Sequence, residues 1–397
     1  MHVLPVVLRV ALAVSLVAIL AACGSSPGGN TDPPPSSPPP ALPERLTACT
    51  DLAGSIEIPD PVFRAYLHLR TGIPEGQPLT CGALRDLTQL FLGSTRTVRS
   101  LEGVEHLQGV TSITLDEQDL LPNSEFYRLG ALKNPTDLKI YGAEQLTSIE
   151  FVASFTQLDI LQVDDSALAS LAGVEDLTAL RTVYVRDNPN LTSAEPLAGL
   201  ENLGTVHVSG NAITSLAPFT GMTGLRKLLA SGNALTAVDV RDLPALEELQ
   251  LTDNQLTSLP AFASLGMPNL RSLAVAINGL TNLAGLEGLT LSFFAATGNE
   301  LTTIHHIADL KGVSMLYLDD NLLTDMTPLG SVEWGSGATV QLGRNCLGVI
   351  YFPESGLHTL PAGPNNETWK DLTLSKGVNV HLMPLASDNR CEGKPGY

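Results

Sequence analysis

Apolar positions recur along most of the chain in a single frame. In the clearest copy, leucines occupy positions 246, 249, 251, 256 and 259, and Asn254 stands between the third and the fourth. Leu249 and Leu251 alternate with polar residues, which predicts a short strand with the leucines facing inward and their neighbours facing outward. One copy cannot bury its own apolar face, so successive copies have to stack as the turns of a solenoid.

A series of asparagines marks the same place in each copy. They are Asn188, Asn211, Asn233, Asn254, Asn278, Asn299, Asn321 and Asn345, spaced 23, 22, 21, 24, 21, 22 and 24 residues apart. An asparagine buried where the chain bends can pair backbone groups of neighbouring turns, each of which would cost about 1–3 kcal/mol if left unpaired. Weaker copies before them carry Ser166, Ala143 and Gln118 at this place, and a first strand is expected at 87–92. The pattern predicts about twelve stacked turns.

These repeats resemble the leucine-rich repeats of the bacterial internalin type, which are about 21–22 residues long. Asn211-Ala-Ile-Thr-Ser-Leu216 and Asn254-Gln-Leu-Thr-Ser-Leu259 match the N-x-L-T-x-L phrase of that family. Ile58-Pro-Asp-Pro-Val-Phe-Arg64 resembles the start of its N-terminal cap. The resemblance covers residues 87–347. It implies an α/β solenoid, a curved right-handed coil with a parallel concave sheet, whose concave face binds proteins.

The segments that flank the repeats are expected to cap them. In residues 44–86, Asp60 and Pro61 fit the N-cap and the first position of a helix that Gly72 can end. Residues 348–397 predict a smaller cap, with a helix near 367–376 and a closing strand at 378–382. Caps are needed because an open solenoid exposes core leucines and a strand edge.

The first 22 residues have the pattern of a bacterial lipoprotein signal peptide. Arg9 precedes an apolar run, and Leu20-Ala21-Ala22-Cys23 resembles the lipobox of that family. The resemblance implies that Cys23 is diacylated, with palmitate as an expected chain, and that it becomes the new N-terminus. Residues 23–43 then comprise the lipidated cysteine and a linker rich in Pro, Gly and Ser. In lipoproteins, a residue other than Asp after the cysteine, here Gly24, fits an outer-membrane or surface location. The alternative is an ordinary signal peptide followed by an incidental cysteine.

Four further cysteines remain, and an even number in an exported chain predicts disulfides. Three pairings are formally possible. Cys49 and Cys81 flank the start of the globular region and Cys346 and Cys391 flank its end, so these two pairs are favoured. No pair has the C-x-x-C spacing of a zinc or redox site, and we expect no metal.

Composition excludes some classes of function. The chain has 41 acidic and 22 basic residues and a net charge of −19, which argues against nucleic acid as a partner. No nucleotide-binding loop or catalytic triad motif is evident, so we expect neither an enzyme nor a cofactor. Asp164-Asp165 and Asp319-Asp320 are interpreted as solvated turn acids rather than calcium ligands, and His305-His306 as residues of the convex surface.

The outward strand positions are the candidate binding residues. The residue four places before each asparagine is expected at mid-strand on the concave face, with a second row two residues later. Aromatic and arginine side chains in these rows are the types enriched at binding hot spots. The candidates are Tyr141, Tyr184, Arg186, His207 and Leu229, with a second patch at Met315 and Tyr317.

Two functions agree with these residues. The first is a membrane-anchored module of the cell envelope or surface that binds a protein through its concave face. The second is a structural envelope solenoid without a single ligand, in which the rings merely pack across strands.

Overall fold

A computed structural model describes residues 48–95, 97–347, 364–382 and 391. The expected signal peptide, Cys23 and the linker therefore lie outside the described residues. Within the described part, no helix is long and apolar enough to span a membrane.

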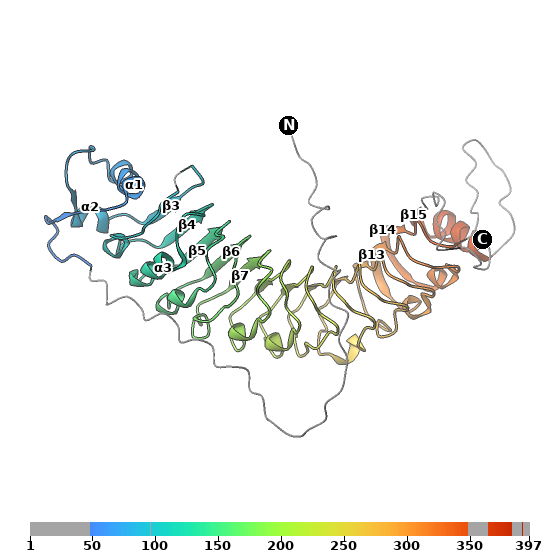
Figure 1. Cartoon of the computed structure of the whole chain (residues 1–397). Coiled ribbons are helices and arrows are strands. Elements are labelled where there is room, and N and C mark those ends of the chain that lie inside the picture. Colours follow the sequence, from blue (N-terminus) through green and yellow to red (C-terminus); the bar gives the residue numbers. More distant parts are fainter. Residues whose placement is uncertain (1–47, 96, 348–363, 383–390, 392–397) are drawn as a thin grey trace, which may run out of the picture. The chain divides into compact units, whose positions relative to one another are not determined.

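One parallel sheet of thirteen strands runs through the repeats, and its strands follow one another in chain order (Figure 1). Each strand is hydrogen-bonded to the strand of the preceding repeat, so each connection is one turn of the solenoid. The strands are β3 (Gln89–Leu92), β4 (Ser112–Asp116), β5 (Asp137–Tyr141), β6 (Ile160–Asp164), β7 (Thr182–Arg186), β8 (Thr205–His207), β9 (Lys227–Leu229), β10 (Glu248–Gln250), β11 (Ser272–Ala274), β12 (Phe293–Ala295), β13 (Lys311–Tyr317), β14 (Glu333–Gln341) and β15 (Asn379–His381). The last of these is the predicted closing strand.

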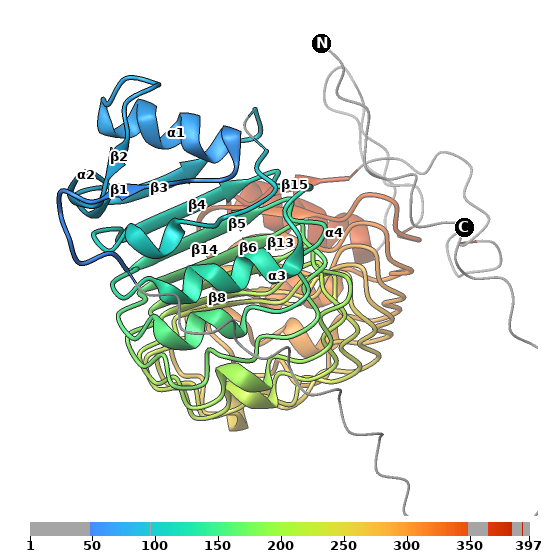
Figure 2. The same cartoon turned by 60° about the vertical axis from the view of Figure 1, so that its left-hand side comes forward.

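Short helical turns lie in most of the connections between the strands. Figure 1 shows them along the outer side of the curved repeat array, with the strands along its inner side, and Figure 2 shows the same arrangement from another angle. They are α3 (Asn123–Phe126) and the 3-10 turns η2 (Val104–His106), η3 (Tyr127–Ala131), η4 (Glu150–Ser154), η5 (Glu195–Leu197), η6 (Ala217–Phe219), η7 (Phe262–Ser264), η8 (His305–Ile307) and η9 (Thr327–Ser331).

The core is built from the inward leucines of every repeat. Leu249 and Leu251 are fully buried, whereas Gln250 between them is only half-buried. The same alternation holds in the neighbouring strands. The face of the sheet that carries these leucines packs on one continuous core, and the other face points to the concave side.

The asparagine ladder is present. The Asn254 side-chain nitrogen donates to the carbonyl oxygens of Ala230 (3.0 Å) and Leu251 (3.1 Å), and its oxygen accepts from the Leu235 amide (3.0 Å). The other asparagines of the series donate to carbonyls in the same manner, and Gln118 does so in a weaker repeat. Asn188 is the first asparagine of the series, and the preceding repeat carries Ser166 at the ladder position. The buried side-chain oxygen of Asn188 accepts no hydrogen bond from the described residues.

The residue just before each ladder position adopts a left-handed backbone. Such residues are Glu117, Gly142, Asp165, Asp187, Gly210, Gly232, Asp253, Ile277, Gly298, Asp320 and Arg344. This conformation turns the chain out of the strand and into the bend that the asparagine closes. Gly and Asp suit it best, because a side chain without branching at Cβ meets the least steric resistance there.

Residues of the N-terminal cap fix both ends of its longer helix and tie that helix to the first repeat. The cap contains β1 (Ser55–Ile56), α1 (Pro61–Thr71), β2 (Leu79–Thr80) and α2 (Cys81–Arg85). Asp60 accepts from the amides of Val62 and Phe63 with one oxygen (both 2.9 Å) and from the Arg99 amide with the other (2.8 Å), so it caps α1 and ties it to the first repeat. Gly72 ends α1 in the left-handed conformation, as predicted.

Tyr66 of α1 lies against the outer edge of β3. Its hydroxyl accepts from the Phe91 amide (2.9 Å) and donates to the Gln89 carbonyl (3.4 Å). These are the groups that a further strand would pair, so a single side chain completes the edge of the sheet.

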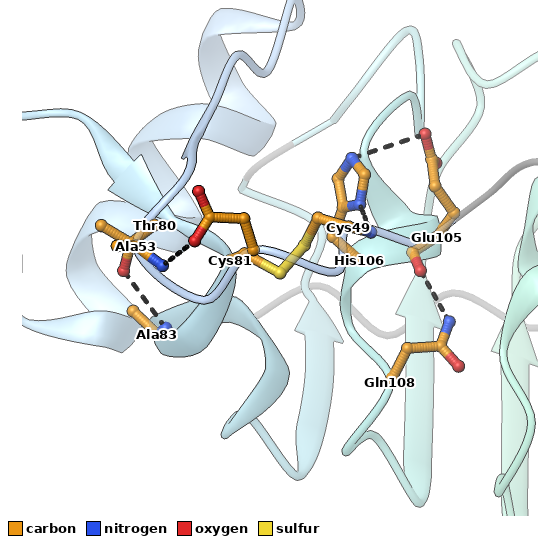
Figure 3. The surroundings of a disulfide bond; sticks show 9 residues. Cys49, Ala53, Thr80, Cys81, Ala83, Glu105, His106 and Gln108 are labelled. Atoms are coloured by element: carbon orange, nitrogen blue, oxygen red, sulfur yellow. Dashed lines mark hydrogen bonds and ion pairs between the residues drawn. A yellow bond between two sulfur atoms is a disulfide. The ribbon is translucent and has the colours of Figure 1, made fainter.

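The disulfides follow the favoured pairing. Cys49 is bonded to Cys81 at the start of α2, with a Cα–Cα distance of 5.9 Å, and the Cys49 amide donates to Nδ1 of His106 (3.1 Å) in η2 (Figure 3). Cys346 is bonded to Cys391, with a Cα–Cα distance of 5.4 Å. At this end, α4 (Pro364–Lys370) and the π-helical turn η10 (Asp371–Ser375) precede Gly377 and β15, near the predicted helix and strand.

Candidate functional site

The register of the sheet brings most of the candidate residues together. Tyr184, His207 and Leu229 stand opposite one another on β7, β8 and β9. Two residues further along the strands, Tyr141 and Arg186 flank Asp164 on β5, β7 and β6. All of these outward side chains except Asp164 are half-buried. Tyr317 belongs to the separate C-terminal part of the face, on β13.

Tyr184 is the centre of this group. Its ring meets the His207 ring edge-on, with centroids 6.0 Å apart and planes at 65°. The Arg186 guanidinium carbon lies 5.8 Å from the Tyr184 centroid, within range of a cation–π interaction worth about 0.5–1 kcal/mol at an exposed site. We call Tyr141, Asp164, Tyr184, Arg186 and His207 the Tyr184 cluster.

Asp164 holds Arg186 in place. Its two oxygens accept from Nε (3.1 Å) and Nη2 (2.5 Å) of Arg186, and the first also accepts from the Arg186 amide (3.1 Å). Asp164 is only 6% exposed, so the expectation of a solvated turn acid is wrong at this residue. A carboxylate is buried only where it is paired, and its partner comes from the next repeat, where no local pattern reveals it.

Burial and neighbouring charges decide which groups of the cluster are ionised. Burial, and then the Arg186 guanidinium, lower the pKa of the His207 imidazole below its ordinary 6.5, so this ring is neutral at pH 7. Burial and the Asp164 carboxylate raise the pKa of the Tyr141 hydroxyl, and the hydrogen bonds that Arg186 donates to Asp164 raise the pKa of Arg186. The cluster therefore consists of uncharged rings around one fixed ion pair.

An acidic hollow of about 430 Å³ borders the cluster where β4 to β7 end. Its carboxylates belong to Glu117, Asp119, Glu144, Asp165 and Asp187. Burial, and then the Asp165 carboxylate, raise the pKa of Asp187. This hollow was not predicted, although its acids directly precede or follow ladder positions in the sequence. Among the described residues, no group of three or more His, Cys, Asp or Glu is arranged to hold a metal ion.

Three residues of the remaining acidic and histidine pairs have partners in a neighbouring repeat. Asp319 accepts from the Gly343 amide (2.8 Å) and Asp320 pairs with Arg344, so neither is a simply solvated acid. His306 pairs with Glu287 (2.7 Å) and His305 is exposed, both on the outer turns, where a surface location was predicted.

The second patch is larger than the sequence suggested. The Tyr317 and Phe293 rings lie 5.6 Å apart, and Met315 is 42% exposed beside them. Phe293 was missed, although it lies in the same row as Met315 and directly opposite it on β12.

Solved structures of other proteins share this architecture. An internalin from Listeria monocytogenes superimposes with a TM-score of 0.65 at 20% identity, over 83% of this chain and 92% of the internalin. A leucine-rich-repeat protein from Leptospira interrogans does so with a TM-score of 0.53 at 22% identity, over 70% of this chain and 78% of that protein. The fold is that of a leucine-rich-repeat solenoid. No protein-family model and no curated protein matches the sequence, so the likeness concerns the fold.

Proposed function

We propose that this leucine-rich-repeat chain binds a protein partner through the Tyr184 cluster on its concave face. The observation that carries the proposal is the fixed geometry of Arg186. Its guanidinium is held by Asp164 and lies by the ring of Tyr184, yet the Arg186 side chain is still 37% exposed. A side chain already ordered in the free protein loses little entropy on binding, and Tyr and Arg are the residues that dominate interface energies.

We also propose that the chain is tethered to a membrane of the cell envelope, with the outer membrane or cell surface favoured. The lipobox-like Leu20-Ala21-Ala22-Cys23 supports a lipid on Cys23. The disulfides Cys49–Cys81 and Cys346–Cys391 agree with an exported protein, because such bonds persist in oxidising compartments. In a polyproline II conformation, residues 24–43 would span up to about 60 Å at about 3.1 Å per residue, enough to hold the solenoid away from the bilayer.

One observation favours the structural alternative. The ring contact between Tyr184 and His207 joins neighbouring strands, and such cross-strand pairs stabilise a sheet without any ligand. A solenoid that serves only as a spacer would need this packing and no partner.

A comparison of variants of the concave and convex faces distinguishes the two functions. The exported chain is used to capture a partner from envelope extracts, and the purified partner is titrated against Tyr184→Ala and Arg186→Ala. Each should weaken binding by about 2 kcal/mol, roughly thirtyfold. The controls are Thr302→Ala and His305→Ala, exposed residues of the outer turns, which should bind as the parent does.

Circular dichroism has to show that all four variants are folded, because Tyr184 also supports the sheet. Equal or greater losses of affinity in the two controls would exclude the concave face as the binding site. The solenoid would then present its outer surface or its caps.

A further inference from the structure

Ile277 occupies a backbone conformation that its side chain disfavours. Its φ is 52°, at the left-handed position before the ladder residue Asn278. Gly or Asp fills eight of the eleven equivalent positions in the described repeats. A β-branched side chain meets the strongest steric resistance in this region. Burial does not offset that resistance, because Ile277 is 56% exposed.

The concave surface next to Ile277 is apolar and carries no charge on two adjacent strands. The outward residues of β11 are Ser272 and Ala274, and those of β12 are Phe293 and Ala295. Met315 and Tyr317 continue this surface on β13. We call Ile277, Phe293, Met315 and Tyr317 the apolar strip. Ile277 lies five residues after Ser272, the partner of Phe293, along β11 and the bend that follows it.

The next repeat leaves Ile277 uncovered. The equivalent position there is Gly298, and a Cβ placed on it would lie 3.4 Å from Cγ1 of Ile277. A side chain at this place would cover part of Ile277, whereas glycine leaves the isoleucine exposed.

The charges around the Ile277 end of the strip are acidic. Asp253, at the same position in the preceding repeat, is exposed, and Asp319 follows β13 two residues after Tyr317. A segment that buries an apolar side chain against Ile277 therefore meets carboxylates at both sides. Charge complementarity calls for basic residues next to that apolar side chain, and disfavours a second copy of this chain, whose net charge is −19.

We propose that the apolar strip docks a protein segment in which an apolar side chain is flanked by Lys or Arg, with Ile277 as its anchor. This rests on the proposed function in that it takes the concave face to be the binding face, and it adds a second site with a defined ligand chemistry. The strained backbone at Ile277 is then retained for binding rather than for folding.

The test uses a random dodecapeptide library displayed on phage and the full exported chain. Peptides are selected on the parent chain and counter-selected on Ile277→Gly, which removes the anchor at a backbone conformation that glycine accepts. The selected peptides should carry an apolar residue next to Lys or Arg. Synthesised with a fluorescent label, they should bind Ile277→Gly and Met315→Ala at least about tenfold more weakly than the parent.

Two controls separate binding from folding. Leu69→Ala removes another exposed apolar side chain, 62% exposed on α1, and should leave peptide affinity unchanged. Ile277→Gly should melt at the same temperature as the parent or higher, because the strain is relieved. A lower melting temperature would assign Ile277 a structural role and overturn the proposal.

Other outcomes also overturn it. Selected peptides without basic residues, or equal affinity for parent and Ile277→Gly, would remove the strip as a docking site. A parent dimer in sedimentation that becomes a monomer in Ile277→Gly would assign the strip to a second copy. If binding of the captured partner requires Tyr184 but binding of no peptide requires Ile277, only this inference is wrong. If peptide binding requires Ile277 but binding of no partner requires Tyr184, the proposed role of the Tyr184 cluster is wrong instead.

Discussion

The side-chain amide of Asn254 connects backbone groups of two repeats, so a substitution at Asn254 tests the ladder. Replacing Asn254 with Ala leaves the Leu235 amide without its acceptor. The carbonyls of Ala230 and Leu251 lose one of two ladder donors and keep those of Asn233 and Asn278. Unpaired groups of this kind cost about 1–3 kcal/mol. Because Asn254 is half-buried, water can replace part of the loss, and we expect Asn254→Ala to lower the free energy of unfolding by about 2 kcal/mol.

Urea denaturation measures this loss. Asn190→Ala is the matched control, since Asn190 is exposed, and it should change the free energy of unfolding by no more than about 0.5 kcal/mol. Equal unfolding midpoints for Asn254→Ala and the parent would show that the ladder does not stabilise the solenoid.

Single residues are also where sequence reasoning fails. In the sequence, Asp164 is an acid at the end of a strand, and its ionic partner, the Arg186 side chain, comes 22 residues later. Ile277 reads as one more apolar residue, because its left-handed backbone and its exposure depend on the bend and on Gly298 in the next repeat. In both cases the deciding neighbour is one repeat away.

At the scale of elements, the first strand depends on a helix rather than on another strand. Tyr66→Phe keeps the ring of α1 but removes the hydroxyl that accepts from the Phe91 amide and donates to the Gln89 carbonyl. We expect a loss of about 1–2 kcal/mol in the stability of the N-terminal cap. Hydrogen exchange followed by mass spectrometry should show faster exchange in β3 and β4, while β11 and β12 keep the exchange of the parent.

Tyr127→Phe provides the comparison, because Tyr127 is also a largely buried ring in the N-terminal half but does not contact a strand edge. If both variants exchange alike across β3, the Tyr66 hydroxyl does not close the sheet. A uniform increase over all repeats would instead mean that the solenoid unfolds as one cooperative unit rather than from its ends.

Elements with a local sequence signature were predictable and the others were not. Asp60, Pro61 and Gly72 mark both ends of α1, and the alternation of Leu249 and Leu251 marks a strand of the repeat. The turns on the outer side, such as Glu195–Leu197, span only three residues. Such turns are too short for any periodicity to appear, so the sequence predicted their place in the repeat but not their conformation.

At the scale of the whole molecule, repetition explains why the fold was predictable and the binding site was not. The inward residues repeat because each turn has to fill the same core. The outward residues are free of that constraint, so their spacing predicts which face they share, as the register of Tyr184, His207 and Leu229 shows. Which of them form a cluster depends on contacts between side chains of different repeats, which the repeat itself does not encode.

The last prediction concerns the attachment of the whole molecule. Cys23→Ser removes the thiol that would carry the lipid, and each CH₂ of a buried acyl chain contributes about 0.8 kcal/mol to membrane binding. The linker after Cys23 is rich in Pro, Gly and Ser, and a chain with a net charge of −19 is repelled by anionic lipid. We therefore expect Cys23→Ser to move from the membrane pellet to the soluble fraction after ultracentrifugation, whereas Ser25→Ala, which keeps the cysteine, stays in the pellet. Detergent should release the parent chain, and high salt should not, because a lipid anchor is held by apolar burial rather than by charge. If Cys23→Ser still pellets, and high salt removes it, the attachment is electrostatic and the proposed lipid anchor is wrong.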